Sequence, residues 1–157
     1  MFGLFKKKSE DFLPVLKGKV VSIEEVPDVV FSQKMLGDGF AIEPENGIVV
    51  APVDGVIAQI FPTNHAFGII TDSGLEILVH IGIDTVDLKG QGFERFVEVD
   101  QKVKAGTPII KFDLVFVRAN AKSVMTPVVV TNKEKVKSMH VNYGVNPEVA
   151  ATVEINN

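Results

Sequence analysis

Imidazole nitrogen is the main reactive group that this sequence offers. The chain has three histidines and no cysteine, so a thiolate nucleophile and a thiolate zinc site are both excluded. His65 and His80 stand on either side of Ser73-Gly74, a dipeptide typical of hairpin turns. A hairpin folded there would bring the two positions across adjacent strands, with Cβ atoms within about 5 Å. The sequence therefore predicts a pair of neighbouring imidazoles.

The surroundings of these histidines favour a functional pair over two unrelated core residues. His80 lies in the apolar stretch 77–83, where a lone histidine would most often be a core residue bonded to a backbone carbonyl. Two adjacent buried imidazoles each need polar partners, so a pair without a purpose would be costly. A neutral imidazole keeps one nitrogen free as a nucleophile or metal ligand. Thr63 shares the strand parity of His65 and could hold its ring.

Phenylalanines lie close to the first histidine. Of the eleven phenylalanines, Phe61 and Phe67 flank His65, and Phe31 falls in an expected loop or short helix. Core packing would explain any one of them, whereas an apolar rim around a polar pair would suit the docking of another protein. The third histidine, His140, lies in a polar stretch, and we expect it at the surface without a catalytic role.

Short β-strands must position these residues. Runs of β-branched residues bounded by glycine or proline predict strands at Lys19–Ile23, Gly47–Val50, Val56–Phe61, Ala66–Ile70, Leu75–Val79, Phe96–Val99, Thr107–Phe112, Val128–Val130 and Ala151–Ile155. Helical pattern is limited to short stretches near 26–31 and 114–121. Closely spaced strands separated by turns predict an all-β fold, an antiparallel sandwich or barrel with short helical turns.

The sequence contains a faint internal repeat. Pro14–Ile23 resembles Pro52–Ile60, and Val103–Phe112 resembles Val145–Ile155 in outline. Two similar β-motifs packed against each other would produce this pattern. No linker or low-complexity tract divides the chain, so we expect a flexible N-terminal tail over residues 1–13 and a single domain over residues 14–157.

Composition narrows the class of partner. The net charge is −4, with 46% hydrophobic and 23% charged residues, which is typical of a globular domain. Nucleic acid is a poor candidate because phosphate backbones attract concentrated lysine and arginine. No segment of the sequence has the roughly 18 consecutive apolar residues of a membrane span. Residues 1–8 place phenylalanine and leucine before three lysines, which is compatible with a solvated tail or with weak contact to an anionic membrane.

Other catalytic patterns are missing from the sequence. It has no P-loop and no His-Glu-x-x-His zinc motif. Biotin and lipoyl carriers have a similar strand and turn texture, echoed in Ala51–Gly55, but they need a lysine at a hairpin tip that does not stand out here. A purely regulatory binding protein, switched by phosphorylation, stays open as an alternative.

Several blocks resemble the glucose-type enzyme IIA (EIIA) family of the bacterial phosphoenolpyruvate:sugar phosphotransferase system. The central block is Glu76–Val86, with Gly74 before it, and other blocks are 37–44, 51–55, 62–68, 90–93, 103–108 and 122–132. The resemblance extends over about residues 14–155. It implies an all-β sandwich of two similar motifs and a monomeric, cytoplasmic phosphotransferase component that carries a phosphoryl group on histidine.

The resemblance also implies a role for each site residue. His80 would accept the phosphoryl group from the phosphocarrier protein HPr and give it to a IIB domain of a glucose-type transporter. His65 would orient the phosphate, and Thr63 would bond His65. The rim positions would be Phe31, Phe61, Phe67, Asp28 and Asp84.

The family further implies regulatory docking to other enzymes or permeases. No cofactor is required, although His65 and His80 could bind zinc with a third ligand from a partner. The tail over residues 1–8 resembles the amphipathic tail of some free-standing members, which points to peripheral membrane contact. The sugar served is not written in this sequence, because the transporter selects it.

Overall fold

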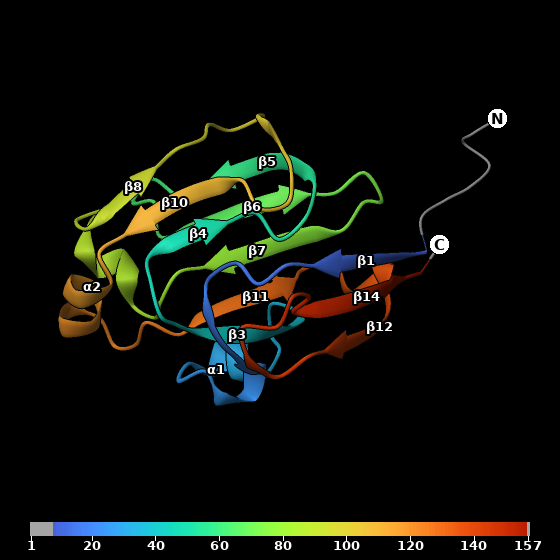
Figure 1. Cartoon of the computed structure of the whole chain (residues 1–157), viewed down its shortest axis with the longest axis horizontal. Helices are drawn as coiled ribbons and strands as arrows, with labels where there is room; N and C mark the ends of the chain where they lie inside the picture. Colours follow the sequence, from blue (N-terminus) through green and yellow to red (C-terminus); the bar gives the residue numbers. More distant parts are fainter. Residues whose placement is uncertain (1–7, 157) are drawn as a thin grey trace.

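A computed structural model describes residues 8–156 and consists mostly of antiparallel β-strands (Figure 1). The strands are β1 (Ser9–Phe12), β2 (Gly18–Ser22), β3 (Asp38–Pro44), β4 (Ile48–Val50), β5 (Gly55–Ile60), β6 (Ala66–Ile70), β7 (Glu76–His80), β8 (Phe93–Arg95), β9 (Lys102–Val103), β10 (Pro108–Phe112), β11 (Thr126–Val130), β12 (Val136–Val141), β13 (Gly144–Val145) and β14 (Ala151–Ile155). The helices are α1 (Val29–Ser32) and α2 (Leu114–Asn120), and the 3-10 turns are η2 (Ile23–Glu25), η3 (Thr85–Leu88) and η4 (Lys133–Lys135). The expected all-β class with short helical turns is confirmed.

The strands form one large and two small sheets within the described chain. The eight-stranded sheet has the order β13-β2-β3-β11-β7-β6-β5-β9, and the three-stranded sheets are β1-β14-β12 and β4-β10-β8. Figure 1 shows β4, β10 and β8 together and β1, β14 and β12 together, with β7, β11 and β3 between them. Among residues 8–156, no helix is long and apolar enough to cross a membrane.

Side-chain alternation gives the large sheet two buried faces. Val79 and Val128 belong to the main core, which the large sheet shares with both small sheets. Their strand neighbours Leu78 and Val129 belong to a second apolar cluster with residues of η2 and α1. Because successive residues of a strand point to opposite faces, His80 at the end of β7 faces the α1 side together with Leu78.

Strand order repeats within the chain. From the centre of the large sheet, one direction reads β11-β3-β2-β13 and the other reads β7-β6-β5-β9. The small sheets β1-β14-β12 and β4-β10-β8 correspond in the same way. The similar segments Pro14–Ile23 and Pro52–Ile60 contain β2 and β5, which occupy equivalent places. One unit, β4 to β10, is therefore inserted between β3 and β11 of the other.

Two expectations about the elements were wrong. Phe96–Val99 is not a strand: the strand in this region is β8, Phe93–Arg95, and Phe96 and Val99 are both 45% exposed. The expected tail was too long, since Ser9–Phe12 pairs with β14 as β1 and Phe12 is buried. The described chain begins at residue 8, so any membrane contact of residues 1–7 lies outside it.

Candidate functional site

One hairpin brings the two histidines together. Strands β6 and β7 pair antiparallel around the turn Thr71–Gly74, with Ala66 opposite His80. His65 precedes β6 by one residue, and its carbonyl oxygen accepts a hydrogen bond from Ile81 N–H at 2.7 Å. The two imidazole centroids are 5.0 Å apart with the rings 79° to each other. The predicted pair is confirmed, although His65 reaches it from the loop before β6 and not from the strand itself.

The loop before β6 fixes the His65 ring. Phe61 N–H donates to the carbonyl of Ala66 at 2.9 Å, and Asn64 N–H donates to the carbonyl of Phe61 at 2.7 Å. Within this closed loop, the Thr63 hydroxyl is hydrogen-bonded to Nδ1 of His65. The predicted contact is present, but strand parity is not its cause, because both residues lie in the loop. His65 is only 3% exposed. Since Nδ1 is bonded to Thr63, Nε2 is the ring nitrogen left for another partner.

A backbone carbonyl orients His80. Nδ1 of His80 lies 2.7 Å from the carbonyl oxygen of Gly82, and since a carbonyl can only accept, Nδ1 carries the proton. The other nitrogen, Nε2, then holds a free lone pair and can act as a nucleophile. His80 is partly exposed, unlike His65. The arrangement gives one accessible nucleophilic nitrogen beside one buried imidazole.

Burial favours the neutral form of both imidazoles. Burial, followed by repulsion from His80, lowers the pKa of His65 to about 4. Burial also lowers the pKa of His80, opposed by the Gly82 carbonyl and by the nearby carboxylates of Asp28 and Asp84. These groups favour a positive charge on the His80 ring. The same groups would stabilise that ring if it became cationic during group transfer.

Aromatic and acidic side chains surround the pair. The ring of Phe31 lies 5.2 Å from His80, and that of Phe61 lies 5.3 Å from His65. Asp28 is the N-cap of α1, accepting a hydrogen bond from Val30 N–H at 2.8 Å. Asp84 precedes η3 with a left-handed φ of 60° and is exposed.

Comparison with known proteins identifies the family. A family model described as phosphoenolpyruvate-dependent sugar phosphotransferase system, EIIA 1, matches residues 10–136. The chain belongs to this family. A glucose-specific EIIA component of Bacillus anthracis is 48% identical over 153 residues, covering 97% of this chain and 93% of the relative. A glucose-specific EIICBA component of Streptococcus pneumoniae is 51% identical over 135 residues, covering 86% of this chain and 19% of the relative.

The fold agrees with a solved structure from the same family. Glucose permease IIA from Mycoplasma capricolum superposes with a TM-score of 0.88 at 44% identity, covering 93% of this chain and 96% of that one. This EIIA protein is thus a phosphotransferase component of the sugar phosphotransferase system and a phosphoryl carrier.

One expected rim residue of the EIIA site lies elsewhere. Phe67 is fully buried in the main core. On β6, Phe67 pairs with Val79 of β7, next to the pair of Ala66 and His80. Because successive residues of a strand alternate in direction, Phe67 points to the face of the sheet away from His80. Its expected place at the rim was wrong. His140 lies on β12 and is exposed, as expected.

Two contributors to the EIIA site escaped sequence reasoning. The Gly82 carbonyl orients His80, and the sequence signal was a glycine two residues beyond the histidine. Asn64 holds a left-handed backbone between Thr63 and His65, with a φ of 59°. Asparagine is among the non-glycine residues that most often adopt this conformation.

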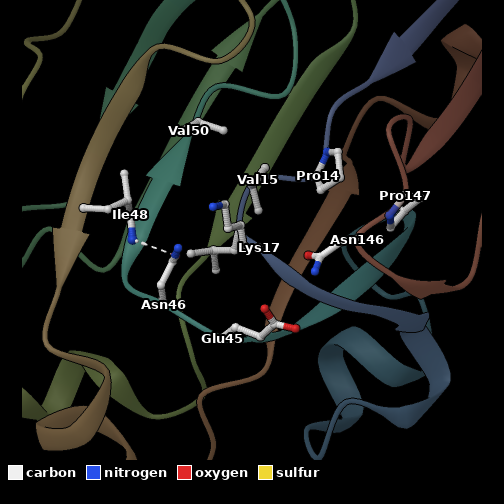
Figure 2. Close-up of a pocket in the computed structure, with 10 residues that line it drawn as sticks. Pro14, Val15, Lys17, Glu45, Asn46, Ile48, Val50, Asn146 and Pro147 are labelled. Carbon is white, nitrogen blue, oxygen red and sulfur yellow. Dashed lines mark hydrogen bonds between the residues drawn. The ribbon is translucent and has the colours of Figure 1, made fainter.

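The other features of the described chain offer less chemistry. A groove of about 590 Å³ lies between β4, the segment 14–17 and Asn146-Pro147 (Figure 2). Its charged lining residues are Lys17 and Glu45, and it contains no histidine. Within residues 8–156, no group of three or more histidine, cysteine, aspartate or glutamate side chains could hold a metal ion.

Proposed function

We propose that His80 of this EIIA protein accepts a phosphoryl group from the phosphocarrier protein HPr and passes it to a IIB domain of a glucose-type transporter. The observation that carries this proposal is that a hydrogen bond fixes the tautomer of His80. Its Nδ1 is held by the Gly82 carbonyl at 2.7 Å, which leaves Nε2 as the nucleophile on a partly exposed ring. The glucose-specific names of the relatives, one of them an EIICBA component, support the choice of transporter.

Transfer begins when the Nε2 lone pair of His80 attacks the phosphorus of the donor's phosphohistidine. A new N–P bond forms as the donor's N–P bond breaks, and the electron pair of the broken bond stays on the donor imidazole. Because the phosphoryl group moves from one histidine nitrogen to another, the two N–P bonds are similar in energy and the group remains transferable. Little covalent work is asked of the protein beyond an aligned nucleophile and well-placed hydrogen-bond donors.

His65 has the role of orienting the phosphoryl oxygens. If the Thr63 hydroxyl donates to Nδ1 of His65, the ring proton lies on Nε2 and can be donated to a phosphoryl oxygen. The depressed pKa of His65 keeps the ring neutral. A fixed neutral donor requires no reorganisation at the moment of transfer.

The rim of the site suits a protein partner. Phe31 and Phe61 pack against the two imidazoles, and apolar rings exclude water from the labile N–P bond. Asp28 and Asp84 place negative charge beside His80. These carboxylates would attract a partner with a basic docking face and set its orientation.

The test is phosphorylation by phosphoenolpyruvate, enzyme I and HPr, followed by measurement of intact mass. The wild type and the His65→Ala variant should gain one acid-labile phosphate, and the His80→Ala variant should gain none. Addition of a IIB domain should then discharge the wild type much faster than His65→Ala. A wild type that gains no mass would exclude the carrier role for His80. Phosphate that never passes to IIB would favour the purely regulatory alternative.

We place the protein in the cytoplasm as a monomer with transient partners, in keeping with its family. Regulatory docking to other enzymes or permeases would use the same rim. Phosphorylation of His80 would then act as the switch, because it adds negative charge beside Asp28 and Asp84. If phosphorylation is the switch, the unphosphorylated and phosphorylated forms should copurify with such a partner to different extents.

Zinc would need a partner to complete its site. If the Thr63 hydroxyl accepts from Nδ1 of His65, the Nε2 atoms of His65 and His80 both have a lone pair for zinc, but the described residues supply no third ligand close enough. We propose that the isolated protein binds zinc weakly and that tight binding requires a carboxylate or histidine from a docked partner. Calorimetric titration of the protein alone would reveal tight binding if this proposal were wrong.

Peripheral membrane contact through residues 1–8 is also proposed. Lys8 is exposed, and its carbonyl accepts a hydrogen bond from Ile155 N–H. The exposed Lys137 lines the same depression as Lys8. Glu154 lines this depression too, so the expected attraction comes from the three consecutive lysines 6–8. They should favour anionic vesicles over neutral ones, and equal sedimentation with both would argue against an electrostatic contact.

A further inference from the structure

Asn64 combines two unfavourable features at the centre of the site loop. Its backbone is left-handed, with a φ of 59°, a conformation that non-glycine residues seldom adopt. Its side-chain oxygen Oδ1 is buried and accepts no hydrogen bond within the described part of the chain. Features of this kind persist where the surrounding structure or the function requires them.

The position of Asn64 in the loop indicates why a left-handed backbone is needed there. It lies between Thr63 and His65, whose side chains meet in a hydrogen bond. Its own N–H closes the turn to the carbonyl of Phe61 at 2.7 Å. The left-handed residue turns the chain between Thr63 and His65, so that the His65 ring lies against the Thr63 hydroxyl. Because Oδ1 has no partner among the described residues, a hydrogen bond to this oxygen is not what accounts for an asparagine here.

The loop is also packed from outside at this point. Gly90 has a φ of 86°, and a Cβ added there would lie 3.7 Å from the Cα and carbonyl oxygen of Thr63. The segment that follows His80 therefore returns to cover the backbone beside Asn64. The Thr63 backbone is held between this segment and the turn that Asn64 closes.

We propose that Asn64 is a positioning residue whose left-handed backbone sets the Thr63–His65 hydrogen bond and so fixes the orientation of the His65 ring. The inference rests on the proposed function for its effect on transfer, but not for its effect on the ring. Asparagine serves better than most residues because it tolerates this backbone. It also confines the chain more than glycine would.

Two substitutions separate the backbone from the amide. Asn64→Gly keeps access to the left-handed region and removes the amide, whereas Asn64→Ala removes both the amide and the conformational preference. The matched control is Asn146, also left-handed with a φ of 47°, whose Oδ1 accepts a hydrogen bond from Gly18 N–H at 2.8 Å. Asn146 lies in the groove of Figure 2, not at the histidine pair.

The first measurement is the pKa and tautomer of His65 by nitrogen NMR in the unphosphorylated proteins. In Asn64→Ala the ring should gain water and its pKa should rise by about one unit or more from its depressed value. Asn64→Gly and Asn146→Ala should retain the wild-type value. This readout needs no phosphoryl transfer, so it remains decisive even if His80 were not the acceptor.

The second measurement separates the two transfer steps. Discharge to a IIB domain should slow by roughly tenfold to a hundredfold in Asn64→Ala, since small misplacements of a positioning group cost that much. Acceptance from HPr should change far less. The proposal is overturned if Asn64→Ala keeps the wild-type pKa of His65, if Asn64→Gly loses as much as Asn64→Ala, or if Asn146→Ala gives the same defect.

Discussion

At the scale of single residues, hydrogen bonds and burial give the two histidines different surroundings. Thr63 bonds Nδ1 of His65, and the Gly82 carbonyl accepts from Nδ1 of His80. Each ring thereby presents Nε2, but one is buried and the other is partly exposed. Two chemically identical side chains thus have different surroundings, which is why we propose different functions for them.

The depressed pKa of His65 predicts acid sensitivity of the fold. An unfolded histidine has a pKa of 6.5, and the folded value is about 4, so the unfolded chain binds more protons between these values. Stability is therefore complete above pH 6.5 and falls as the pH drops toward 4, where the loss levels off. His80, with its pKa also lowered, contributes in the same direction.

Urea unfolding at two pH values measures this effect. Between about pH 7.5 and about pH 5, the free energy of unfolding should drop by about 2 kcal/mol from His65 alone. Residue 65 cannot titrate in the variant His65→Gln, so its free energy of unfolding should fall by about 2 kcal/mol less than that of the wild type over the same pH interval. An identical pH dependence in both proteins would show that His65 is not depressed in the folded state.

At the scale of elements, the β6–β7 hairpin supplies the site and the segment after it completes the site. Gly82 has a φ of 71°, and a Cβ there would lie 2.6 Å from Cγ2 of Thr85 and 2.8 Å from the carbonyl oxygen of Ser123. Thr85 is itself fixed, because its hydroxyl donates to the carbonyl of Ile81 at 2.6 Å. The carbonyl that orients His80 is thus held in a crowded turn.

Gly82→Ala should disturb both the turn and the nucleophile. Crowding and the left-handed backbone together should cost roughly 2–4 kcal/mol of unfolding free energy, and phosphoryl acceptance should fall with it. Gly68→Ala in the same hairpin is the control, since its nearest neighbour would be Ile77 O at 3.8 Å. That variant should stay within about 0.5 kcal/mol of wild type. Equal stability of the two variants would contradict the crowding argument.

At the scale of the whole molecule, two similar units interlock. The unit β4 to β10 is continuous in sequence, whereas the other unit is split around it. Both contribute to one main core, as Phe12 and Val153 from one unit and Val49 and Ile110 from the other illustrate. In the large sheet, β7 of one unit pairs with β11 of the other.

A fragment of residues 46–113 should therefore fail to fold alone, although it contains all strands of one unit. Removal of β11 leaves the edge of β7 unpaired, and the shared core opens to water. Amide NMR dispersion and thermal unfolding of the fragment, with the full chain as reference, test this expectation. Dispersed amides and a cooperative transition in the fragment would show that the units are independent.

Local pattern in the sequence was enough to predict much of this EIIA protein. The Ser73-Gly74 turn and flanking β-branched strands indicated the hairpin, and hence the neighbouring histidines. The exact register was not predicted, since Ala66 and not His65 stands opposite His80. The contact of Thr63 with His65 was predicted from strand parity, but both residues lie in the loop before β6, where Asn64 has a left-handed backbone. The resemblance around Glu76–Val86 then indicated the family, which the comparisons confirmed.

Tertiary structure alone decided the rest of the site. Phe67 faces the core because of the β6 register with β7, and Phe31 reaches His80 because α1 packs on the outer face of the large sheet. β1 is a strand only because β14, from the far end of the chain, lies beside it. These features depend on contacts between residues distant in sequence, whose pairing no local pattern of side chains specifies.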